Sequence, residues 1–303
     1  MLIVRIMGGL GNQMFQYALY KKLSKTGKNV KIDISSYNNY QKHNGYELES
    51  VFCIKPPICS ISEAMHYIKT YEKRKRSKNI ISRIIRKCEK LLANQSIMLP
   101  GFIRQDDVKY FPNILKMKKG YLSGYWQSEK YFQGAEEDVI EDFAFNINDL
   151  DEKNKRIAKE IIDVNSVSVH IRRGDYYSDP EAYRIHGDIC TEKYYQKALQ
   201  KIKELTDNPI YYVFSDDPQW VKKNLDIRDA RFIDWNTSNS SSIDMKLMSL
   251  CKHNIIANSS FSWWAAYLNR NIKKIVIAPD RWNNRRNKDQ YDIVPANWIK
   301  IET

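Results

Sequence analysis

Short apolar runs alternate with segments of helical periodicity along the second half of the chain. The apolar runs predict strands at residues 166–171, 210–214, 231–235, 254–257 and 274–278. Between them, apolar residues recur three and four positions apart, which predicts helices at 191–203, 218–225, 242–251 and 260–268. Ser241 or Ser242 is the expected N-cap of the third helix. Strands separated by helices of this length are typical of parallel sheets with right-handed crossovers.

The N-terminal region opens with the same kind of unit. A strand is predicted at residues 2–7, a glycine-rich turn at 8–13, a helix at 14–25 and a second strand at 30–34. This order of strand, turn, helix and strand is the opening of an α/β domain.

A domain boundary is predicted where acidic and polar residues gather between Glu136 and Lys155. We therefore expect an α/β protein in which two Rossmann-like parallel-sheet domains, residues 1–153 and 154–303, face a cleft. Ligands of parallel sheets bind at the carboxyl ends of the strands. Candidate functional residues should therefore follow the predicted strands.

A basic helical insert is predicted within the first domain, at about residues 61–93. Between residues 69 and 90 there are ten Lys or Arg and only two acids, and isoleucines recur at helical spacing. Such a helix could lie on an anionic membrane surface. It could also pack on the core with its basic side in water, and the sequence slightly favours this second interpretation.

Composition narrows the class of protein. The 303 residues carry 49 Lys and Arg against 36 Asp and Glu, a net charge of +13 that favours nucleic acid, anionic lipid or a phosphorylated substrate as partner, or simply reflects an AT-rich genome. No apolar run approaches the roughly 18 residues of a membrane helix. The N-terminus has the pattern of a strand, with no signal peptide. Five scattered cysteines predict neither a zinc site nor a disulfide framework, so a reducing cytoplasm is the expected setting.

The first candidate site is the glycine-rich turn from Gly8 to Gln13, between a strand and a helix. Glycines permit close approach of a ligand, and the amides of a helix N-terminus can bind an anion. The spacing matches neither a dinucleotide-binding fingerprint nor a P-loop. Gly9, Asn12 and Gln13 are the candidate ligand-binding residues, because both amide side chains are expected to face the cleft. The alternative is an ordinary tight turn.

The second candidate follows the strand at 166–171. His170, Arg172 and Arg173 stand at its carboxyl end, and adjacent arginines in a cleft require an anion to pair with them. A guanidinium can bind two phosphate oxygens at once. His170 and Arg172 should share one face, and Arg173 should point away toward a structural carboxylate. The alternative is an exposed strand end with solvated charges.

The third candidate comes after the strand at 210–214. Ser215, Asp216 and Asp217 follow it, and Pro218 makes Asp217 a good helix cap. Asp216 is expected to orient an arginine. We predict no metal site here, although adjacent carboxylates could in principle bind one.

The fourth candidate lies between residues 244 and 264. Asp244 is predicted on a helix and could accept hydrogen bonds from the adjacent N–H donors of guanine. Asn258, Ser259 and Ser260 follow a strand and open a helix, where hydroxyls and free amides could hold a phosphate or merely cap the helix. The aromatic residues of that helix are predicted to be core: Trp263, Trp264 and Tyr267. Nowhere does the sequence suggest a Ser-His-Asp, Cys-His or clustered metal-ligand arrangement.

The chain resembles the α-1,2-fucosyltransferases of glycosyltransferase family 11. Four blocks carry the resemblance, in the family's order and across nearly the whole chain: Gly8-Gly-Leu-Gly-Asn-Gln-Met-Phe-Gln-Tyr17, His170-Ile-Arg-Arg-Gly-Asp-Tyr176, Phe214-Ser-Asp-Asp217 and Asn258-Ser-Ser-Phe-Ser-Trp-Trp264. A wider set of α-1,2, α-1,6 and protein-O-fucosyltransferases shares the His-x-Arg-Arg block.

The resemblance implies a two-domain GT-B fold, GDP-β-L-fucose as the donor, inversion at the anomeric carbon, and no metal or other cofactor. It implies that residues 154–303 bind the GDP-sugar and that the N-terminal domain lies on the acceptor side. Within the donor site, it implies that Arg172 contacts the diphosphate, that His170 and Asp244 bind near the guanine, and that Ser259 and Ser260 contribute. We expect the remaining candidates to bind the donor as well: Gly9, Asn12, Gln13, Ser215, Asp216 and Asn258.

An inverting transfer must move a proton from the acceptor hydroxyl. Asp175 is the first candidate base, His186 the second, and Glu181 stays open. A highly dissociative path could instead pass the proton to the departing phosphate.

Other functions remain open from the sequence. The same residues could serve a different nucleotide sugar. A basic nucleic-acid-binding protein fits the charge, but no recognisable module is present. A membrane-surface scaffold leaves the block at His170 unexplained. The expected acceptor is the 2-hydroxyl of a galactose-containing oligosaccharide or lipid-linked glycan, in O-antigen or another surface glycan. We expect a cytoplasmic enzyme, peripheral at the inner membrane, without nucleic acid as partner.

Overall fold

The computed structural model describes residues 1–38, 44–76, 101–105, 109–237, 240–285 and 292–303. It divides into two compact units, Met1–Asp142 and Phe143–Thr303. The division falls earlier in the chain than the boundary predicted at residue 153. The side chain of Asp151, within the predicted boundary region, instead caps the first long helix of the second unit, α6 (Glu152–Asp163), by accepting from the amide of Asn154.

Unit 1 is built on a parallel sheet of four strands in the order β2-β1-β4-β3. The strands are β1 (Leu2–Arg5), β2 (Val30–Asp33), β3 (Gly101–Arg104) and β4 (Gly120–Ser123). The α-helices are α1 (Leu10–Lys25), α2 (Leu48–Phe52), α3 (Ile61–Arg76) and α5 (Glu136–Asp142). Short 3-10 helices occupy Ser35–Tyr37, Pro112–Lys116 and Glu129–Tyr131.

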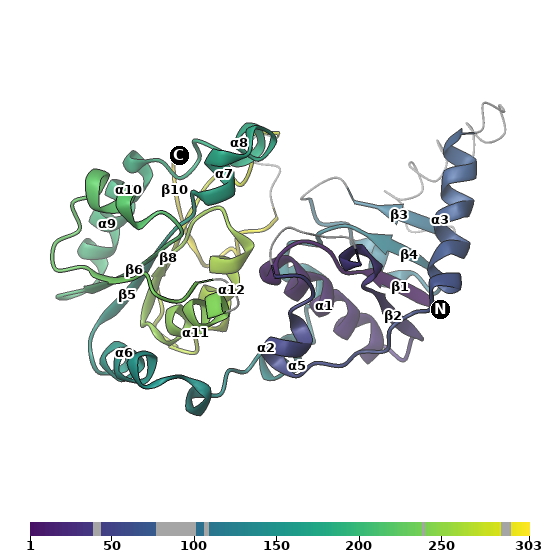
Figure 1. Cartoon of the computed structure of the whole chain (residues 1–303), viewed down its shortest axis with the longest axis horizontal. Helices are drawn as coiled ribbons and strands as arrows, with labels where there is room; N and C mark the ends of the chain where they lie inside the picture. The colour runs from purple at the N-terminus through teal and green to yellow at the C-terminus, as the bar shows by residue number, and fades with distance from the viewer. Residues whose placement is uncertain (39–43, 77–100, 106–108, 238–239, 286–291) are drawn as a thin grey trace. The chain divides into compact units, whose positions relative to one another are not determined.

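The alternating side chains of β1 divide between the two faces of this sheet. Leu2 and Val4 belong to the same core cluster as Leu19 of α1. Ile3 points the other way and packs in the cluster that contains Tyr67 of α3. Figure 1 shows α1 and α3 on opposite sides of the sheet. Unit 1 is thus a three-layer α/β domain, as its first strand, turn and helix predict.

The basic insert is only partly described. Its first part is α3, whereas residues 77–100, which hold most of the predicted amphipathic pattern, lie outside the described residues. In the described part of the chain, we find no helix with the length and apolarity needed to span a membrane.

Unit 2 has a parallel sheet of six strands in the order β10-β9-β8-β5-β6-β7. The strands are β5 (Ser166–Ile171), β6 (Ile210–Ser215), β7 (Arg231–Ile233), β8 (His253–Ile255), β9 (Val276–Pro279) and β10 (Ile299–Ile301). Counted from β5, this is the 3-2-1-4-5-6 order of the doubly wound fold. The chain reverses direction across the sheet between β5 and β8, which makes that position the topological switch point.

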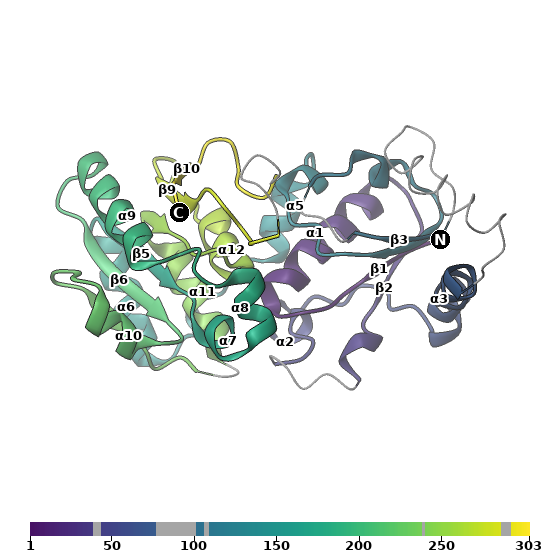
Figure 2. The same cartoon turned by 90° about the horizontal axis from the view of Figure 1, so that it is seen from above.

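Helices cover both faces of this second sheet. They are α6, α7 (Gly174–Ser178), α8 (Pro180–His186), α9 (Glu192–Leu205), α10 (Pro218–Asn224), α11 (Ser241–Leu250) and α12 (Ser260–Leu268), with a 3-10 turn at Ile147–Asp149. Figure 1 shows α9 and α10 on one side of the sheet and α11 and α12 on the other. The short helices α7 and α8 lie side by side in both views (Figure 2).

The core of unit 2 follows the predicted pattern. Val167 and Val169 of β5 pack with Tyr195 of α9. Trp263 and Trp264 are fully buried, which confirms their prediction as core residues. The expected cap of α11 was wrong: the N-cap position is Ser240, and its side chain makes no capping bond.

Candidate active site

Three of the four sequence blocks meet at the carboxyl edge of the unit 2 sheet. His170 lies near the end of β5, and Ser215 ends the adjacent strand β6, directly opposite Ile171. Asn258 follows β8, the other neighbour of β5. Ligands of doubly wound folds bind at this edge, beside the switch point. The sheet order therefore gathers the sequence-predicted residues of unit 2 where a ligand is expected.

Arg172 is held by two carboxylates. Its Nη2 lies 2.7 Å from Oδ1 of Asp175, and its Nη1 lies 2.8 Å from Oδ2 of Asp216. Burial alone would lower the pKa of Arg172, but the two carboxylates outweigh it and raise the pKa above its ordinary value. The side chain keeps 29% of its surface exposed. Arg172 is thus a fixed positive charge that still reaches solvent, which suits an anionic ligand.

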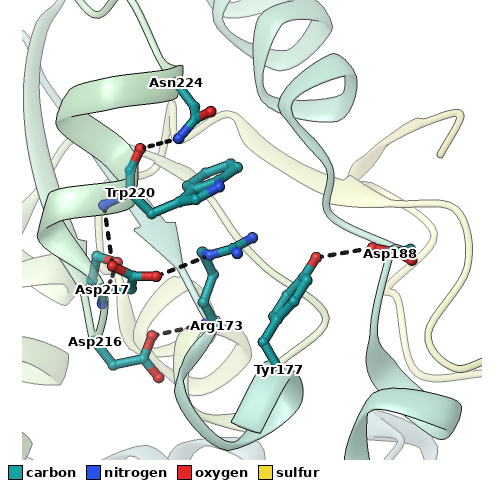
Figure 3. Close-up of polar contacts among 8 residues, drawn as sticks. Arg173, Tyr177, Asp188, Asp216, Asp217, Trp220 and Asn224 are labelled. Atoms are coloured by element: carbon teal, nitrogen blue, oxygen red, sulfur yellow. Dashed lines mark hydrogen bonds and ion pairs between the residues drawn. The ribbon is translucent and has the colours of Figure 1, made fainter.

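Arg173 is a structural residue, as Figure 3 shows. Its guanidinium lies 3.8 Å from the ring centre of Tyr177 and 4.0 Å from that of Trp220, and its Nε donates to Asp217 at 3.1 Å. Asp217 also caps α10 by accepting from the amide of Trp220. The structure confirms both the turn of Arg173 toward a carboxylate and the capping role of Asp217.

Asp216 links the two arginines. Its Oδ1 accepts from the backbone amide of Arg173 at 2.7 Å, while Oδ2 pairs with Arg172. A Cβ at Gly174 would lie 2.6 Å from Oδ2 of Asp216, so only glycine leaves room for the carboxylate there. Asp216 therefore orients an arginine, as predicted. The side chain of Ser215 has a local role, because its Oγ accepts from the amide of Asp217 at 3.0 Å.

Replacing Arg173 by lysine should destabilise unit 2. Lysine keeps the charge but cannot stack as a plane between two rings while bonding Asp217, so we expect the free energy of unfolding to fall by about 2 kcal/mol. Thermal and urea unfolding would measure it. Arg231→Lys is the matched control, because Arg231 forms an exposed pair with Glu160 and its conservative replacement should change stability little. Equal unfolding curves for Arg173→Lys and the wild type would contradict the stabilising role of Arg173.

His170 is a neutral, buried imidazole at this edge. Burial, with a smaller contribution from the charge of Arg172, lowers its pKa to about 3. Its ring lies 5.9 Å from that of Phe261, and within the described residues its Nδ1 has no hydrogen-bond partner although it is buried. A buried polar atom without a partner is unfavourable, so a ligand atom could satisfy it.

Two of the candidate bases lie beside Tyr176. The His186 ring stacks on the Tyr176 ring, 4.8 Å between centres, and burial lowers the pKa of His186. Its Nδ1 is buried and makes no hydrogen bond within the described part of the chain. Asp175, in contrast, is paired with Arg172. Glu181 is mostly exposed on α8, 3.9 Å from Arg184.

Asn258 connects the segments around this edge. Its Nδ2 donates to the backbone carbonyls of His186 and Trp282, and the backbone carbonyl of Asn258 accepts from the hydroxyl of Tyr176 at 3.1 Å. Its amide group is therefore committed to the backbone, which gives Asn258 a structural task in addition to any ligand contact. Ser259 is buried at the N-cap of α12 without a capping bond from its side chain, and Ser260 begins that helix half-buried.

Asp244 is a desolvated carboxylate in the first turn of α11. Burial raises its pKa to about 7, opposed by one hydrogen bond from Nδ2 of Asn236 at 2.8 Å. Asn236 pairs in turn with Asn154, which also accepts from the indole of Trp235. The sequence did not reveal Asn236 or Asn154, because their contacts join α6 to the loop after β7, far apart in the chain.

Unit 1 places the glycine-turn residues differently from the prediction. Gln13 is fully buried: its Nε2 donates to the carbonyls of Gly8 and Gly45, and its Oε1 accepts from the amide of Glu47. The buried carboxyl group of Glu47, whose pKa is raised by burial, accepts a hydrogen bond from the backbone of Leu10, so an acidic side chain already occupies the N-terminus of α1. This corrects the expectation that both amides face a ligand. Gly9 is the N-cap of α1, and Asn12 is half-buried, with its Oδ1 bonded by Gln127.

Among the described residues, we find no cluster of three or more His, Cys, Asp or Glu side chains that could hold a metal ion.

The family model described as "Glycosyl transferase family 11" matches residues 1–302 of the chain. The protein belongs to glycosyltransferase family 11. This confirms the family that the four blocks suggested.

Two relatives of this family 11 protein come from Escherichia coli. An alpha-1,2-colitosyltransferase is 39% identical over 99% of this chain and 98% of the relative. The O-antigen biosynthesis glycosyltransferase WbnK is 32% identical over 97% and 98%. Among solved structures, fucosyltransferase NodZ from Bradyrhizobium covers 87% of this chain and 90% of its own, with a TM-score of 0.50 and 16% identity. That likeness confirms the predicted fold of two parallel-sheet α/β domains.

Proposed function

We propose that this family 11 enzyme transfers L-fucose from GDP-β-L-fucose to the 2-hydroxyl of a galactoside, with inversion at the anomeric carbon. One observation carries the proposal. The three blocks shared with α-1,2-fucosyltransferases in unit 2 converge on the switch point, where they combine the fixed guanidinium of Arg172 with the neutral imidazole of His170. Outside these blocks, the desolvated carboxyl group of Asp244 lies in the first turn of α11.

Each part suits one part of the donor. Arg172 binds the diphosphate, to which its charge and forked geometry are matched. Asp244 accepts from the N1–H and N2–H₂ donors of guanine, which compensate a carboxylate otherwise poorly paired. His170 lies beside the base with an unsatisfied nitrogen. Ser259, Ser260 and the N-terminus of α12 complete the phosphate site.

The proposed transfer forms one bond at C1 of fucose and breaks another. The acceptor oxygen attacks C1 of fucose from the face opposite GDP, and the bond between C1 and the β-phosphate oxygen breaks. Its electron pair leaves with GDP, where Arg172 stabilises the growing negative charge. Because a side chain supplies that charge, we propose that no metal is required. The hydroxyl proton passes to a base or to the departing phosphate.

The geometry around the base favours His186 over the first choice of Asp175. Asp175 is already bound to the Arg172 guanidinium, whereas the lowered pKa of His186 leaves a neutral imidazole that can accept a proton. Near-normal turnover of Asp175→Asn, with strong loss in His186→Gln, would support this assignment. The reverse pattern would return the role to Asp175.

A second donor has specific support, because the E. coli relative at 39% identity is named for colitose. Colitose is L-fucose without its 3-hydroxyl, so the same GDP site could serve both sugars. The discrimination would rest on whether a protein group hydrogen-bonds the 3-hydroxyl. The name of the second E. coli relative supports a role in O-antigen synthesis. Such a role would place the enzyme at the cytoplasmic face of the inner membrane.

The deciding experiment compares donors. GDP release and linkage analysis by NMR would follow incubation of the enzyme with a galactoside panel and either GDP-fucose or GDP-colitose. We expect an α-1,2-linked product and faster release from GDP-fucose. Faster release from GDP-colitose would select the second donor, and release of GDP from neither would reject the proposal.

A further inference from the structure

The segment after β4 holds a bulky residue in an unusual backbone conformation. Trp126 has φ of +53° and is fully buried. A positive φ is rare for a large side chain, and such strain, of about 1–3 kcal/mol, persists where the surroundings enforce it and tends to mark functional sites. The segment lies at the carboxyl edge of the unit 1 sheet, because β4 runs parallel to β1 and ends at Ser123. That is the edge at which parallel sheets bind ligands.

Several contacts enforce this conformation. The amide of Trp126 donates to Oε1 of Gln105 at 2.9 Å, and its carbonyl accepts from the amide of Ser128 at 2.9 Å. The indole packs edge-on against Tyr131, with ring centres 5.5 Å apart. Gln16, buried within α1, donates from Nε2 to the carbonyl of Gly124. The strained turn is therefore fixed from both sides before any ligand arrives.

The result of the turn is an exposed ring. Tyr125 is 45% exposed, although Gly124 and Trp126 on either side are buried. Only one other Phe, Tyr or Trp side chain in the described residues is comparably exposed, Tyr183, and its ring and hydroxyl are engaged by Tyr177 and Asp188. Tyr125 makes no such contact within the part of the chain that the structure describes. An aromatic ring held at a ligand-binding edge without a partner is suited to bind one.

A pair of amides stands two residues further along. Nε2 of Gln127 donates to Oδ1 of Asn12 at 2.7 Å, which joins the segment after β4 to the first turn of α1. No further side-chain hydrogen bond of either residue occurs within the described residues. The pair therefore keeps a donor, Nδ2 of Asn12, and an acceptor, Oε1 of Gln127. A donor beside an acceptor matches neighbouring hydroxyls on a sugar.

We propose that Tyr125, with the Asn12–Gln127 amide pair, forms the subsite for the acceptor galactose. The inference rests on the proposed glycosyltransferase function and names the residues that hold its acceptor. In β-galactose the axial 4-hydroxyl leaves an apolar face of C–H groups at C3, C4 and C5, which stacks on an aromatic ring. The amides bind hydroxyls at the rim. This assigns Asn12 to the acceptor, in place of the donor role predicted from the sequence.

The test uses lactose, whose terminal sugar is galactose, with GDP-fucose as donor. Tyr125→Ala should raise the KM for lactose about tenfold, the effect of losing one stacked ring, while the KM for GDP-fucose and the melting temperature stay close to wild type. Tyr125→Phe keeps the ring and should restore the KM for lactose. Ile272→Ala, at a side chain that is 97% exposed in unit 2, is the control for surface substitution.

Binding without turnover separates this proposal from the donor assignment. Saturation-transfer NMR would detect lactose on the wild type and on Tyr125→Ala with no donor present, with cellobiose, which ends in glucose, as the comparison sugar. Contact with lactose that exceeds contact with cellobiose and is lost in Tyr125→Ala supports the subsite, even if GDP-fucose proves to be the wrong donor. Equal lactose contact in both proteins, no contact in the wild type, or an unchanged KM for lactose would overturn it.

Discussion

Arg172→Ala is expected to lower kcat for sugar transfer about a thousandfold, because it removes the charge that stabilises the leaving diphosphate. Arg172 is the guanidinium at the switch point that is held by two carboxylates and yet partly exposed. Its removal also leaves Asp175 and Asp216 facing the diphosphate with their negative charge less compensated, which adds to the loss. Steady-state kinetics with GDP-fucose and a galactoside would measure both kcat and KM.

Chemical rescue and matched variants separate charge from folding. Arg172→Lys keeps the charge but lacks the planar fork whose two nitrogens bond Asp175 and Asp216 separately, so we expect an intermediate loss of about tenfold to a hundredfold. Added guanidinium should partly restore Arg172→Ala. Arg184→Ala removes an exposed arginine from α8 and should behave as wild type. A loss in Arg172→Ala that matches its loss of folded protein, without rescue, would remove the catalytic role.

Much of unit 2 could be predicted because its signal is local. Apolar runs and helical periodicity marked β5 and α12 at their observed bounds. The sequence does not predict α6, whose first residues fall in the expected boundary region, because charged residues cover most of the helix and only Ala158 and Ile161 supply buried apolar side chains. The short edge strand β10 was missed because its residues are at most half-buried. The strand order was beyond reach, since pairing such as that of β5 with β8 joins segments that are distant in sequence.

The same division applies to the site. The structural roles of Arg173 and Asp217 could be predicted from the alternation of side chains along a strand and from helix-capping chemistry, both of which are local. The burial of Gln13 depends on its hydrogen bonds with Gly45 and Glu47, and the pattern of apolar residues in the sequence does not indicate these contacts. Likewise, the positive φ of Trp126 cannot be read from a residue type that normally avoids it. The direction of a side chain at a tertiary contact thus could not be predicted from the sequence.

Donor binding should depend on pH through Asp244. Burial raises the folded pKa of this carboxyl from 3.8 to about 7, so it is largely protonated below that pH in the unliganded enzyme. A guanine base with two adjacent donors needs the ionised form, so binding must expel the proton. The KM for GDP-fucose should therefore rise, by up to about tenfold for each pH unit below 7, and level off above it. His170, whose pKa is lowered to about 3, stays neutral throughout this range and cannot produce the same profile.

Asp244→Asn distinguishes this cause from other titrations. Asparagine cannot ionise, so the variant should bind GDP-fucose weakly and lose the pH slope between 5 and 7. The pH dependence of the free energy of unfolding tests the same titration independently. A raised folded pKa means that the folded state binds the proton more tightly, so the free energy of unfolding of the unliganded enzyme should fall as pH rises toward 7. That decline should be absent in Asp244→Asn, which should be the more stable protein at neutral pH. A persistent slope in the variant would assign the dependence to another group, because both phosphates of GDP-fucose are diesters that do not titrate near neutrality.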